Sequence, residues 1–333
     1  MLTLALPLSR TLPAPLAQFD SVIMEEAAQV LDIETFIPLL LQSGGVESKL
    51  KRFVLIGDQH QLPPVISNEA LASFAHLDQS MFSRFVRSGV PTIQLDAQGR
   101  ARASLANLYR WRYEQRGASL GDLPLVAEGR YRVANAGCAL EYQWVNVTGV
   151  ESAPRPNMWQ SIEEAEYVVA VYRYMRLIGH PAASIAILST YRGQVSLIND
   201  VLAKRVAPYP FFGMPVVSTV DSFQGSAADI VLLSLVRSTT VGFMRDVRRW
   251  VVALSRARLG LYIFGNQALY AEIRALDGAF SQLAARPTKL LLVAGERFPT
   301  QRAVEDVPKD AVEITDVAHI GAVVREMEVA AGL

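Results

Sequence analysis

Apolar and polar positions follow two alternating patterns along this chain of 333 residues. Short apolar runs that are rich in aliphatic residues and bounded by turn residues predict buried strands. Between them lie longer stretches in which apolar residues recur at helical spacing, which predicts helices packed on a core. This alternation indicates an α/β fold with parallel sheets. The predicted strands include Phe19–Met24, Phe53–Ile56, Ile185–Ser189, Asp229–Val236 and Gly260–Phe264.

The stretch from Val216 to Asn266 organises the rest of the chain. Its two long apolar runs flank a predicted helix, Arg245–Arg258, which has an apolar face and many arginines. Arginine at the end of a strand–helix–strand unit suits phosphate, because the planar guanidinium binds two oxygens of an oxyanion at once. The alternative is a solvated basic helix face, which is the ordinary explanation of a charge run.

The pattern places further elements on either side of this stretch. Ser161 and Glu164 have the spacing of a capping box at the start of a helix. Pro91–Leu95 is predicted as a strand that leads into a second lobe, and Leu120–Ser152 is predicted to be irregular. Helices are predicted at Ile33–Leu41, Asp78–Val86 and Ser161–Met175.

Composition restricts the class of protein. Hydrophobic residues make up 51% of the chain and the formal net charge is +0, so a nucleic-acid site would need a local basic patch. A single cysteine, Cys138, excludes an intrachain disulfide framework and a multi-cysteine zinc site. No apolar run is long enough to span a membrane, and Met1–Leu16 lacks the basic start of a signal peptide. We therefore expect a reducing compartment and no membrane partner.

Two strings near the middle of the chain carry a family resemblance. Residues 218–225 read STVDSFQG and residues 252–258 read VALSRAR. They resemble motifs V and VI of superfamily 1 RNA/DNA helicases, in the up-frameshift-like branch and, within it, the intron-binding helicases of the spliceosome. The resemblance extends from about Phe19 to about Pro299. It implies RecA-like P-loop NTPase lobes with parallel sheets.

A pair of carboxylates follows the first predicted strand. Glu25 and Glu26 begin the string EEAAQ at its carboxyl end, where ligands of open α/β sheets gather. Paired carboxylates there can hold Mg²⁺ and polarise an attacking water, although a charged helix start looks the same. The resemblance makes this string motif II. It implies that Glu25 holds the metal and that Glu26 activates water.

The loop after the second predicted strand reads GDQHQLPP at residues 57–64. It resembles motif III, which implies that Gln61 senses the γ-phosphate of ATP and that Asp58 supports the metal and the water. The alternative from the residues alone is an ordinary turn capped by an aspartate. The two adjacent prolines stiffen the loop, which suits an element that couples nucleotide and nucleic-acid sites.

A third string, LDAQGRARASL at residues 95–105, resembles the arginine-bearing motif IV region. The resemblance implies that Arg100 is an arginine finger in phosphoryl transfer. Gly99 stands where relatives often carry an aromatic residue that stacks on adenine. Downstream, arginines alternate with Tyr109, Trp111 and Tyr113. This pattern predicts either a stacking platform for single-stranded RNA or a helix whose aromatic residues face the core.

The resemblance also implies RNA and nucleotide contacts in the second half of the chain. The implied RNA contacts are Tyr191 and Gln194 in the string TYRGQ, and Thr219 and Asp221 in motif V. The implied nucleotide contacts are Gln224, Gly225 and Arg258, with Arg256 reaching the γ-phosphate. For residues 190–194 the alternative is a plain strand–turn–helix connection.

The motif order predicts four parts of the chain. They are an unassigned segment 1–18, a partial first lobe 19–94 with motifs II and III, a second lobe 95–285 with motifs IV to VI, and an extension 286–333. The phosphate-cradling string GxxxxGK[ST] is absent from the 333 residues. The first lobe is therefore predicted to be truncated, and the chain alone is expected to hydrolyse ATP poorly.

Two hypotheses stay open at this stage. In the first, the chain is a fragment of an ATP-dependent RNA helicase that acts in pre-mRNA splicing. The resemblance then implies ATP and Mg²⁺ as cofactors, pre-mRNA introns and spliceosomal proteins as partners, and the nucleus as location. In the second, the chain is a non-hydrolysing module that binds RNA or protein.

Overall fold

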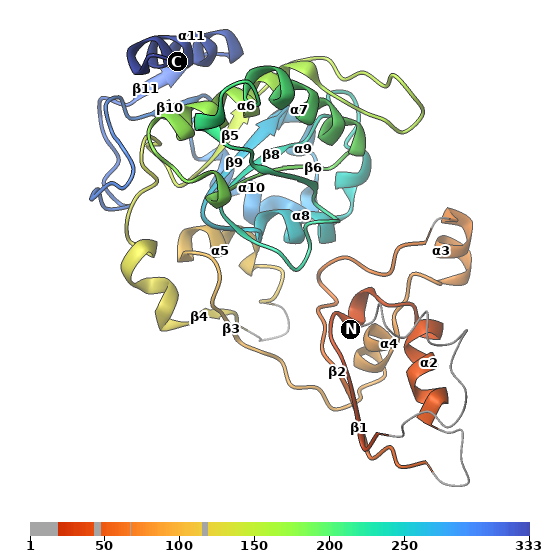
Figure 1. Ribbon diagram of the computed structural model, residues 1–333. Coiled ribbons are helices and arrows are strands. Elements are labelled where there is room, and N and C mark those ends of the chain that lie inside the picture. Colours follow the sequence, from red (N-terminus) through yellow and green to blue (C-terminus); the bar gives the residue numbers. More distant parts are fainter. Residues whose placement is uncertain (1–18, 43–47, 67, 115–118) are drawn as a thin grey trace. The chain divides into compact units, whose positions relative to one another are not determined.

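The computed structural model describes residues 19–42, 48–66, 68–114 and 119–333 (Figure 1). The chain divides into two compact units, Met1–Gln94 and Leu95–Leu333. Both units combine helices with parallel strands, so the predicted α/β class is confirmed. The predicted segment 1–18 lies outside the described residues.

Unit 1 is built around two parallel strands. β1 (Ser21–Met24) pairs with β2 (Arg52–Leu55), and Met24 lies opposite Leu55 at the carboxyl ends. Parallel pairing therefore brings the loops that follow the two strands to the same edge. The other elements of the unit are η2 (Ala27–Gln29), α2 (Asp32–Gln42), α3 (Glu69–Ala75) and α4 (Met81–Arg87).

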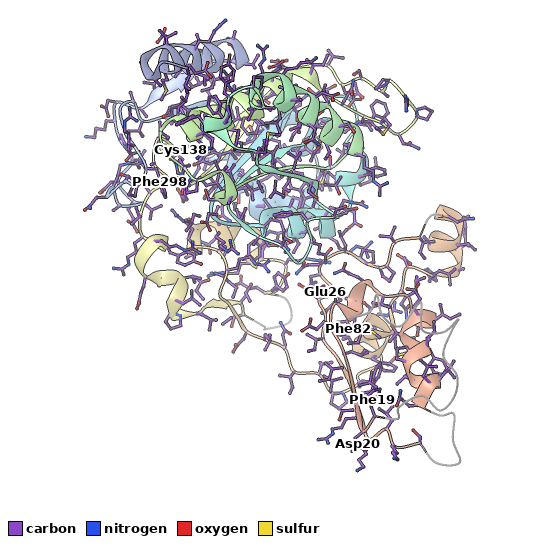
Figure 2. All side chains as sticks on the ribbon, viewed as in Figure 1. Phe19, Asp20, Glu26, Phe82, Cys138 and Phe298 are labelled. Atoms are coloured by element: carbon purple, nitrogen blue, oxygen red, sulfur yellow. The ribbon has the colours of Figure 1, made fainter. Side chains whose placement is uncertain are left out.

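A small apolar cluster holds the loop after β1 against α4. Met24, Ala27 and Val30 are buried, and Leu55 and Phe82 pack against them. Figure 2 labels Phe82 and Glu26, and it places Glu26 and Asp20 at opposite ends of β1. The cluster fixes the backbone that carries the predicted motif II.

The strand predicted at Pro91–Leu95 is wrong. Each residue of this run is exposed, and Ile93 is 96% exposed. A strand needs a neighbour that pairs with its backbone N–H and C=O groups. No strand among the described residues pairs with this run, so its apolar composition was a misleading signal.

Unit 2 contains a five-stranded parallel sheet in the order β5-β9-β8-β6-β7. Ser189 lies opposite both Thr219 and Ser234, and these three residues mark the carboxyl edge of the sheet. Because the strands are parallel, each connection must return from the carboxyl edge to the amino edge. The strands are β5 (Tyr142–Asn146), β6 (Ile185–Ser189), β7 (Val216–Thr219), β8 (Ala228–Ser234) and β9 (Ala257–Gly265).

Helices cover both faces of this sheet (Figure 1). One face meets α6, α7 and α11 in the larger apolar core, which includes Ile187, Leu232 and Phe264. On the other face, the side chains of Trp144, Trp250, Tyr270 and Phe280 form an aromatic cluster with ring centroids 5.3–6.1 Å apart. The helices are α5 (Ala103–Arg110), α6 (Ile162–Leu177), α7 (Arg192–Arg205), α8 (Val247–Leu254), α9 (Gln267–Tyr270), α10 (Asp277–Ala284) and α11 (Val317–Ala331).

Short elements complete unit 2. β3 (Ala97–Gln98) pairs in parallel with β4 (Gly121–Asp122), and β10 (Leu290–Leu292) pairs antiparallel with β11 (Val312–Ile314). The 3₁₀ turns are η3 (Pro124–Ala127), η4 (Gly129–Tyr131), η5 (Ala182–Ser184), η6 (Pro210–Phe212), η7 (Gly242–Arg245) and η8 (Arg274–Leu276).

Two elements of unit 2 differ from the sequence prediction. Leu120–Ser152 is not irregular throughout, because it contains β5, an edge strand of the main sheet. The helix predicted at Arg245–Arg258 is shorter. Asp246 begins α8 by accepting the N–H of Arg248 at Oδ1 (2.9 Å), and the helix ends at Leu254 because β9 starts three residues later.

Candidate functional site

Motifs II and III lie side by side at the carboxyl edge of β1 and β2. The N–H of Ala27 donates to the carbonyl oxygen of Ile56 (2.9 Å), which joins the loop after β1 to the end of β2. Gly57 lies so close to this loop that a Cβ there would meet the backbone nitrogen of Ala28 at 2.8 Å. Only glycine fits at that approach, so residue 57 sets the spacing of the two motifs.

The motif II carboxylates are exposed, and the backbone of one is strained. Glu26 has φ 51° and ψ 33°, a left-handed conformation that residues other than glycine seldom adopt. Its Oε2 accepts the side-chain N–H of Gln29 (2.5 Å). Glu25 is also exposed.

Motif III has an internal hydrogen-bond pattern of its own. Asp58 accepts the backbone N–H of His60 at Oδ1 (2.8 Å) and the side-chain N–H of Gln61 at Oδ2 (2.8 Å). The aspartate therefore orients Gln61, as an Asp-capped turn would. Asp58 and Gln61 come from the loop next to Glu25 and Glu26, so unit 1 brings the four predicted residues to one edge.

Two predicted phosphate-binding arginines of unit 2 converge on Ser255. Arg100 donates from Nη1 to the carbonyl oxygen of Ser255 (3.3 Å), and Arg256 donates from Nη2 to Oγ of Ser255 (2.7 Å). Gln98 fixes the backbone of the first, because its Oε1 accepts the N–H groups of Arg100 and Ala101 (both 2.9 Å). Residues far apart in the sequence thus form one cationic cluster.

Arg100 and Arg256 differ in exposure. The side chain of Arg256 is 1% exposed, and it also donates to the carbonyl oxygens of Val252 (2.9 Å) and Ser226 (3.2 Å). Arg100 is half-buried. Arg258 forms an ion pair with Asp229 (3.5 Å), which also pairs with Arg130 (3.2 Å), so its charge is partly neutralised.

Gln224 is the motif V residue with the clearest need for a ligand. Its Nε2 and Oε1 atoms are both enclosed, yet neither meets a hydrogen-bond partner among the described residues. Enclosed amide atoms of this kind are rare, since each one left unbonded is costly. Gly225 follows with φ 81°, a conformation that allows the loop to turn toward β8.

The predicted RNA contacts gather at the carboxyl edge of the main sheet. Thr219 accepts the N–H of Ser222 at Oγ1 (3.1 Å). Asp221 is exposed and forms an ion pair with Arg249 (3.1 Å). Tyr191 and Gln194 are buried in the next connection along the sheet. The structure therefore brings the four residues to one edge, but only the motif V pair reaches solvent.

The two buried residues have protein partners. Tyr191 accepts the N–H of Phe243 at its hydroxyl (3.2 Å) and stacks on that ring with centroids 5.2 Å apart. Gln194 accepts the N–H of Ser161 at Oε1 (2.8 Å) and donates from Nε2 to Oγ of Ser234 (3.0 Å). These contacts give both side chains a structural role, and their contact with RNA stays a prediction.

The aromatic residues of the predicted stacking platform pack mainly inside unit 2. Tyr109 is 5% exposed and packs edge-on against Tyr113 (6.4 Å between centroids). Trp111 donates from Nε1 to the carbonyl oxygen of Leu108 (3.0 Å) and lies against Gly278. Of the two alternatives, the helix with core-facing aromatic residues fits Tyr109 in α5, whereas Trp111 and Tyr113 follow the end of the helix and are half-buried.

Glu164 has a role that its sequence position did not indicate. Ser161 begins α6 as predicted, because its Oγ accepts the N–H of Glu164 (3.3 Å). The carboxylate does not return to the cap. It accepts the hydroxyl of Ser234 (2.6 Å) and the N–H of Val236 (2.9 Å) at the carboxyl end of β8. The Ser161 half of the predicted capping box is confirmed and the Glu164 half is wrong, because the Glu164 carboxylate bonds to residues at the end of β8 instead.

The carboxylate of Glu164 supports a strained turn. Val236 has φ 74°, which is unfavourable for a β-branched residue, and the N–H of Arg237 donates back to the carbonyl oxygen of Leu235 (2.9 Å). The turn directs Arg237 between two aromatic rings, 3.9 Å from the centroid of Trp159 and 5.9 Å from that of Tyr191. Glu164 thus stabilises the turn at the carboxyl edge of the main sheet through its hydrogen bonds to Ser234 and Val236.

Burial raises the pKa of Glu164 to about 7, and hydrogen bonds from Ser234 and the backbone oppose that rise. The pKa of Glu164 in the folded protein lies above 4.5, the ordinary pKa of a glutamate side chain, so folding favours the protonated form. The stability that this protonated form contributes is therefore fully present below pH 4.5. It is lost as the pH rises through the folded-state value. Glu164→Gln is expected to remove about 3 kcal/mol of pH-dependent stability between pH 4.5 and 7. Urea unfolding across this range measures the effect.

Glu163→Gln is the matched control for this experiment, since residue 163 lies in the same turn of α6 but is only half-buried. Its pH dependence should follow that of the wild type. A Glu164→Gln protein whose stability fell as steeply with pH as the wild type would contradict the assignment.

No metal cluster is evident within the described residues. Across residues 19–42, 48–66, 68–114 and 119–333, no three side chains of His, Cys, Asp or Glu gather in a way that could hold a metal ion. Nor does any helix in these ranges have the length and apolar character needed to cross a membrane.

The motif geometry agrees with comparisons to known families. Residues 77–268 match the AAA domain family, and residues 3–69 match a second family of the same description. The first match covers more than half of the chain. The chain belongs to the AAA domain family, and the resemblance to superfamily 1 helicases of the up-frameshift-like branch is confirmed.

Individual relatives point to one member of this branch. The chain is 53% identical over 305 residues to the RNA helicase aquarius of Mus musculus. This alignment covers 89% of this chain and 20% of that protein. It is 28% identical over 300 residues to the pre-mRNA-splicing factor cwf11 of Schizosaccharomyces pombe. This alignment covers 88% of this chain and 23% of that protein. The chain thus spans about a fifth of the length of these relatives.

Among solved structures, the PRRSV helicase is similar with a TM-score of 0.39 and 16% identity. The match covers 93% of this chain and 49% of that one.

Proposed function

We propose that this chain forms part of an ATP-dependent RNA helicase that acts in pre-mRNA splicing. The observation that carries the proposal is the 53% identity to the RNA helicase aquarius over 89% of the chain. The strings that resemble helicase motifs, at residues 25–29, 57–64, 218–225 and 252–258, support the same proposal. A nuclear location and spliceosomal protein partners follow from the same proposal, because the second relative is a pre-mRNA-splicing factor.

The donor set of unit 1 suits Mg²⁺ bound to a nucleotide. Mg²⁺ is usually held by one or two carboxylates together with phosphate oxygens and water. We assign Glu25 as the carboxylate that holds the ion and Asp58 as the one that supports it. Glu26 takes a proton from the attacking water, and Gln61, oriented by Asp58 (2.8 Å), senses the γ-phosphate.

The donor set of unit 2 suits the phosphates of ATP. Arg100 and Arg256 offer two guanidinium groups to charge that develops during phosphoryl transfer. The enclosed amide of Gln224 offers both a donor and an acceptor with no partner in the described structure, which supports a polar ligand beside Gly225. Arg258 has a secondary role, since Asp229 already pairs with it (3.5 Å). When bound, ATP supplies the phosphoanhydride bond whose hydrolysis drives remodelling of RNA.

Single-stranded RNA is proposed to lie at the carboxyl edge of the main sheet. Thr219 and Asp221 reach solvent there and can contact its sugar and phosphate groups. Tyr191 and Gln194 shape this edge through the connection after β6. The edge also carries Arg249, so a local cationic group is present in a chain whose formal net charge is +0.

Phosphate release with and without single-stranded RNA tests the proposal. The protein expressed from its full reading frame is expected to release phosphate faster when RNA is present. Glu26→Gln should lower that rate by about 100-fold or more, because a general base is lost, while RNA binding stays unchanged. If the rate of phosphate release by the wild-type protein were the same with and without RNA, the helicase proposal would be refuted.

The second candidate is a non-hydrolysing module that binds RNA or protein. It is favoured by the absence of GxxxxGK[ST] from the 333 residues. RNA-stimulated phosphate release from the 333-residue chain by itself would eliminate this candidate. RNA binding without hydrolysis, both in that chain and in the product of the full reading frame, would favour it.

A further inference from the structure

The predicted extension 286–333 contains a segment that reaches the backbone of Arg100 through one intervening loop. Residues 293–304, here called the strap, belong to the connection between β10 and β11. The strap lies along residues 131–138, here called the support loop. Figure 2 labels Phe298 in the strap and Cys138 in the support loop. The roles assigned above to the motif residues do not involve the strap.

Backbone hydrogen bonds join the strap to the first part of the support loop. The N–H of Ala134 donates to the carbonyl oxygen of Arg302 (2.8 Å), and the N–H of Val304 donates to the carbonyl oxygen of Arg132 (2.9 Å). This is antiparallel pairing, in which alternate residues turn their backbone groups toward the partner and away from it. The backbone N–H and carbonyl groups of Val133, between the two bonded residues, therefore face away from the strap.

A forked ion pair inside the strap holds the last part of the support loop. Arg302 donates from Nε to Oε1 of Glu296 (2.9 Å) and from Nη2 to Oε2 (3.0 Å), and such a fork fixes orientation as well as distance. Glu296 also accepts the N–H of Gly137 at Oε2 (2.7 Å). Arg302 also donates from Nη2 to the carbonyl oxygen of Cys138 (2.7 Å). Each side chain of the ion pair is only 13% exposed, which strengthens these hydrogen bonds.

The opposite side of the support loop holds the backbone around Arg100. The hydroxyl of the buried Tyr131 donates to the carbonyl oxygen of Arg100 (3.0 Å). The carbonyl oxygen of Val133 accepts Nη2 of the buried Arg102 (3.1 Å). The backbone N–H of Arg102 donates in turn to the carbonyl oxygen of Arg258 (3.0 Å). The support loop is therefore bonded to the strap on one side and to residues 100–102 on the other.

From this arrangement we infer that the strap positions Arg100 for phosphoryl transfer, with Glu296 and Tyr131 as positioning residues that act through the support loop. The inference rests on the proposed function, and in particular on Arg100 as the arginine finger. The guanidinium of Arg100 makes a long hydrogen bond to the carbonyl oxygen of Ser255 (3.3 Å), so its place depends mainly on its backbone. A displacement of about 1 Å in a catalytic group can cost about 100-fold in rate.

Two matched controls separate positioning from ordinary structural support. Glu328 of α11 pairs with Arg173 of α6, and each of these side chains is also 13% exposed. Glu328→Gln therefore breaks an ion pair of the same kind in the same extension. Tyr172 is a buried tyrosine whose hydroxyl donates to the carbonyl oxygen of Phe212 (2.9 Å), so Tyr172→Phe makes the same chemical change as Tyr131→Phe. Both control contacts join α6 to elements other than the support loop.

The test uses the protein expressed from its full reading frame and follows phosphate release against ATP concentration with saturating single-stranded RNA. Glu296→Gln is expected to lower kcat about tenfold and Tyr131→Phe about threefold. The KM for ATP should stay unchanged, because Arg100 acts on charge that develops in the transition state. Glu328→Gln and Tyr172→Phe should keep the wild-type kcat, although thermal unfolding should show a loss of stability similar to that of the variants they match.

A double-variant cycle shows whether the strap acts through Arg100. In an Arg100→Ala background, Glu296→Gln should change kcat by less than about twofold, since the group that it positions is already gone. The full tenfold loss in this background would overturn the inference. An equal loss of kcat in Glu328→Gln would do the same, as would a wild-type kcat in both Glu296→Gln and Tyr131→Phe.

Failure of this inference can be told apart from failure of the proposed function. Each of the three contrary results leaves RNA-stimulated hydrolysis by the wild-type protein intact, so the strap would lose its positioning role and the proposed function would stand. A wild-type protein that releases phosphate at the same rate with and without RNA would remove the proposed function and the role of the strap together.

Discussion

Replacing Arg100 by alanine is expected to lower RNA-stimulated ATP hydrolysis by about three orders of magnitude, the scale on which arginine fingers act in phosphoryl transfer. The loss follows from removing the half-buried cation that lies beside the enclosed Arg256. Arg100 is half-buried and donates to a single carbonyl oxygen, that of Ser255 (3.3 Å), so folding should be little affected. Steady-state phosphate release by the product of the full reading frame measures the effect, with circular dichroism to check the fold.

Arg130→Ala is the matched control for Arg100→Ala. Arg130 is an exposed arginine of unit 2 that pairs with Asp229 (3.2 Å) rather than with Ser255. Its loss should leave turnover unchanged. An Arg100→Ala protein with more than a tenth of wild-type turnover would remove Arg100 from the catalytic assignment. Arg256→Ala is less informative, because it deprives three oxygens of a donor, two of them in buried hydrogen bonds, and should also reduce stability.

Replacing Trp144 by alanine is expected to lower the free energy of unfolding of unit 2 by about 4 kcal/mol, within the range found when large core aromatic residues are truncated. Trp144 is fully buried and contacts the rings of Trp250, Tyr270 and Phe280. Its Nε1 also donates to the carbonyl oxygen of Gly265 (2.8 Å), which would be left without that donor. Urea unfolding followed by circular dichroism gives the measurement.

Trp144→Phe separates packing from hydrogen bonding in the same position. The phenyl ring keeps part of the aromatic contact but cannot donate to Gly265. Its loss of stability should therefore be clearly smaller than that of the alanine variant. A loss below about 1 kcal/mol for Trp144→Ala would mean that the aromatic cluster adds little to the core.

Local patterns were enough to predict the strands that hold the motifs. β6 begins and ends at the predicted residues, Ile185–Ser189. It is a short apolar run bounded by turn residues, so the signal lies within the strand itself. The edge that collects Glu25, Glu26 and Asp58 was also predictable, because residues that follow parallel strands meet at one edge.

Other features depend on partners that no local window contains. β5 reads YQWVN, and Gln143, its second residue, interrupts the apolar run that would have marked a strand. This glutamine is fully buried because its Nε2 donates to the carbonyl oxygen of Pro287 (2.8 Å) and its Oε1 accepts the N–H of Leu291 (3.2 Å). The carboxylate of Glu164 is likewise set by Val236 rather than by its own helix. Such contacts could not be read from the sequence alone.

The order of strands in the main sheet has a consequence for biosynthesis. β5 is made early but, among the strands that the structure describes, it pairs with β9 alone, so Tyr142 must wait for Leu261 to leave the ribosome. During this interval, which lasts several seconds at ordinary rates of translation, Trp144 has no ring to pack against from α8, α9 or α10. The nascent chain therefore presents an unpaired strand with an exposed tryptophan, which is the kind of segment that chaperones bind.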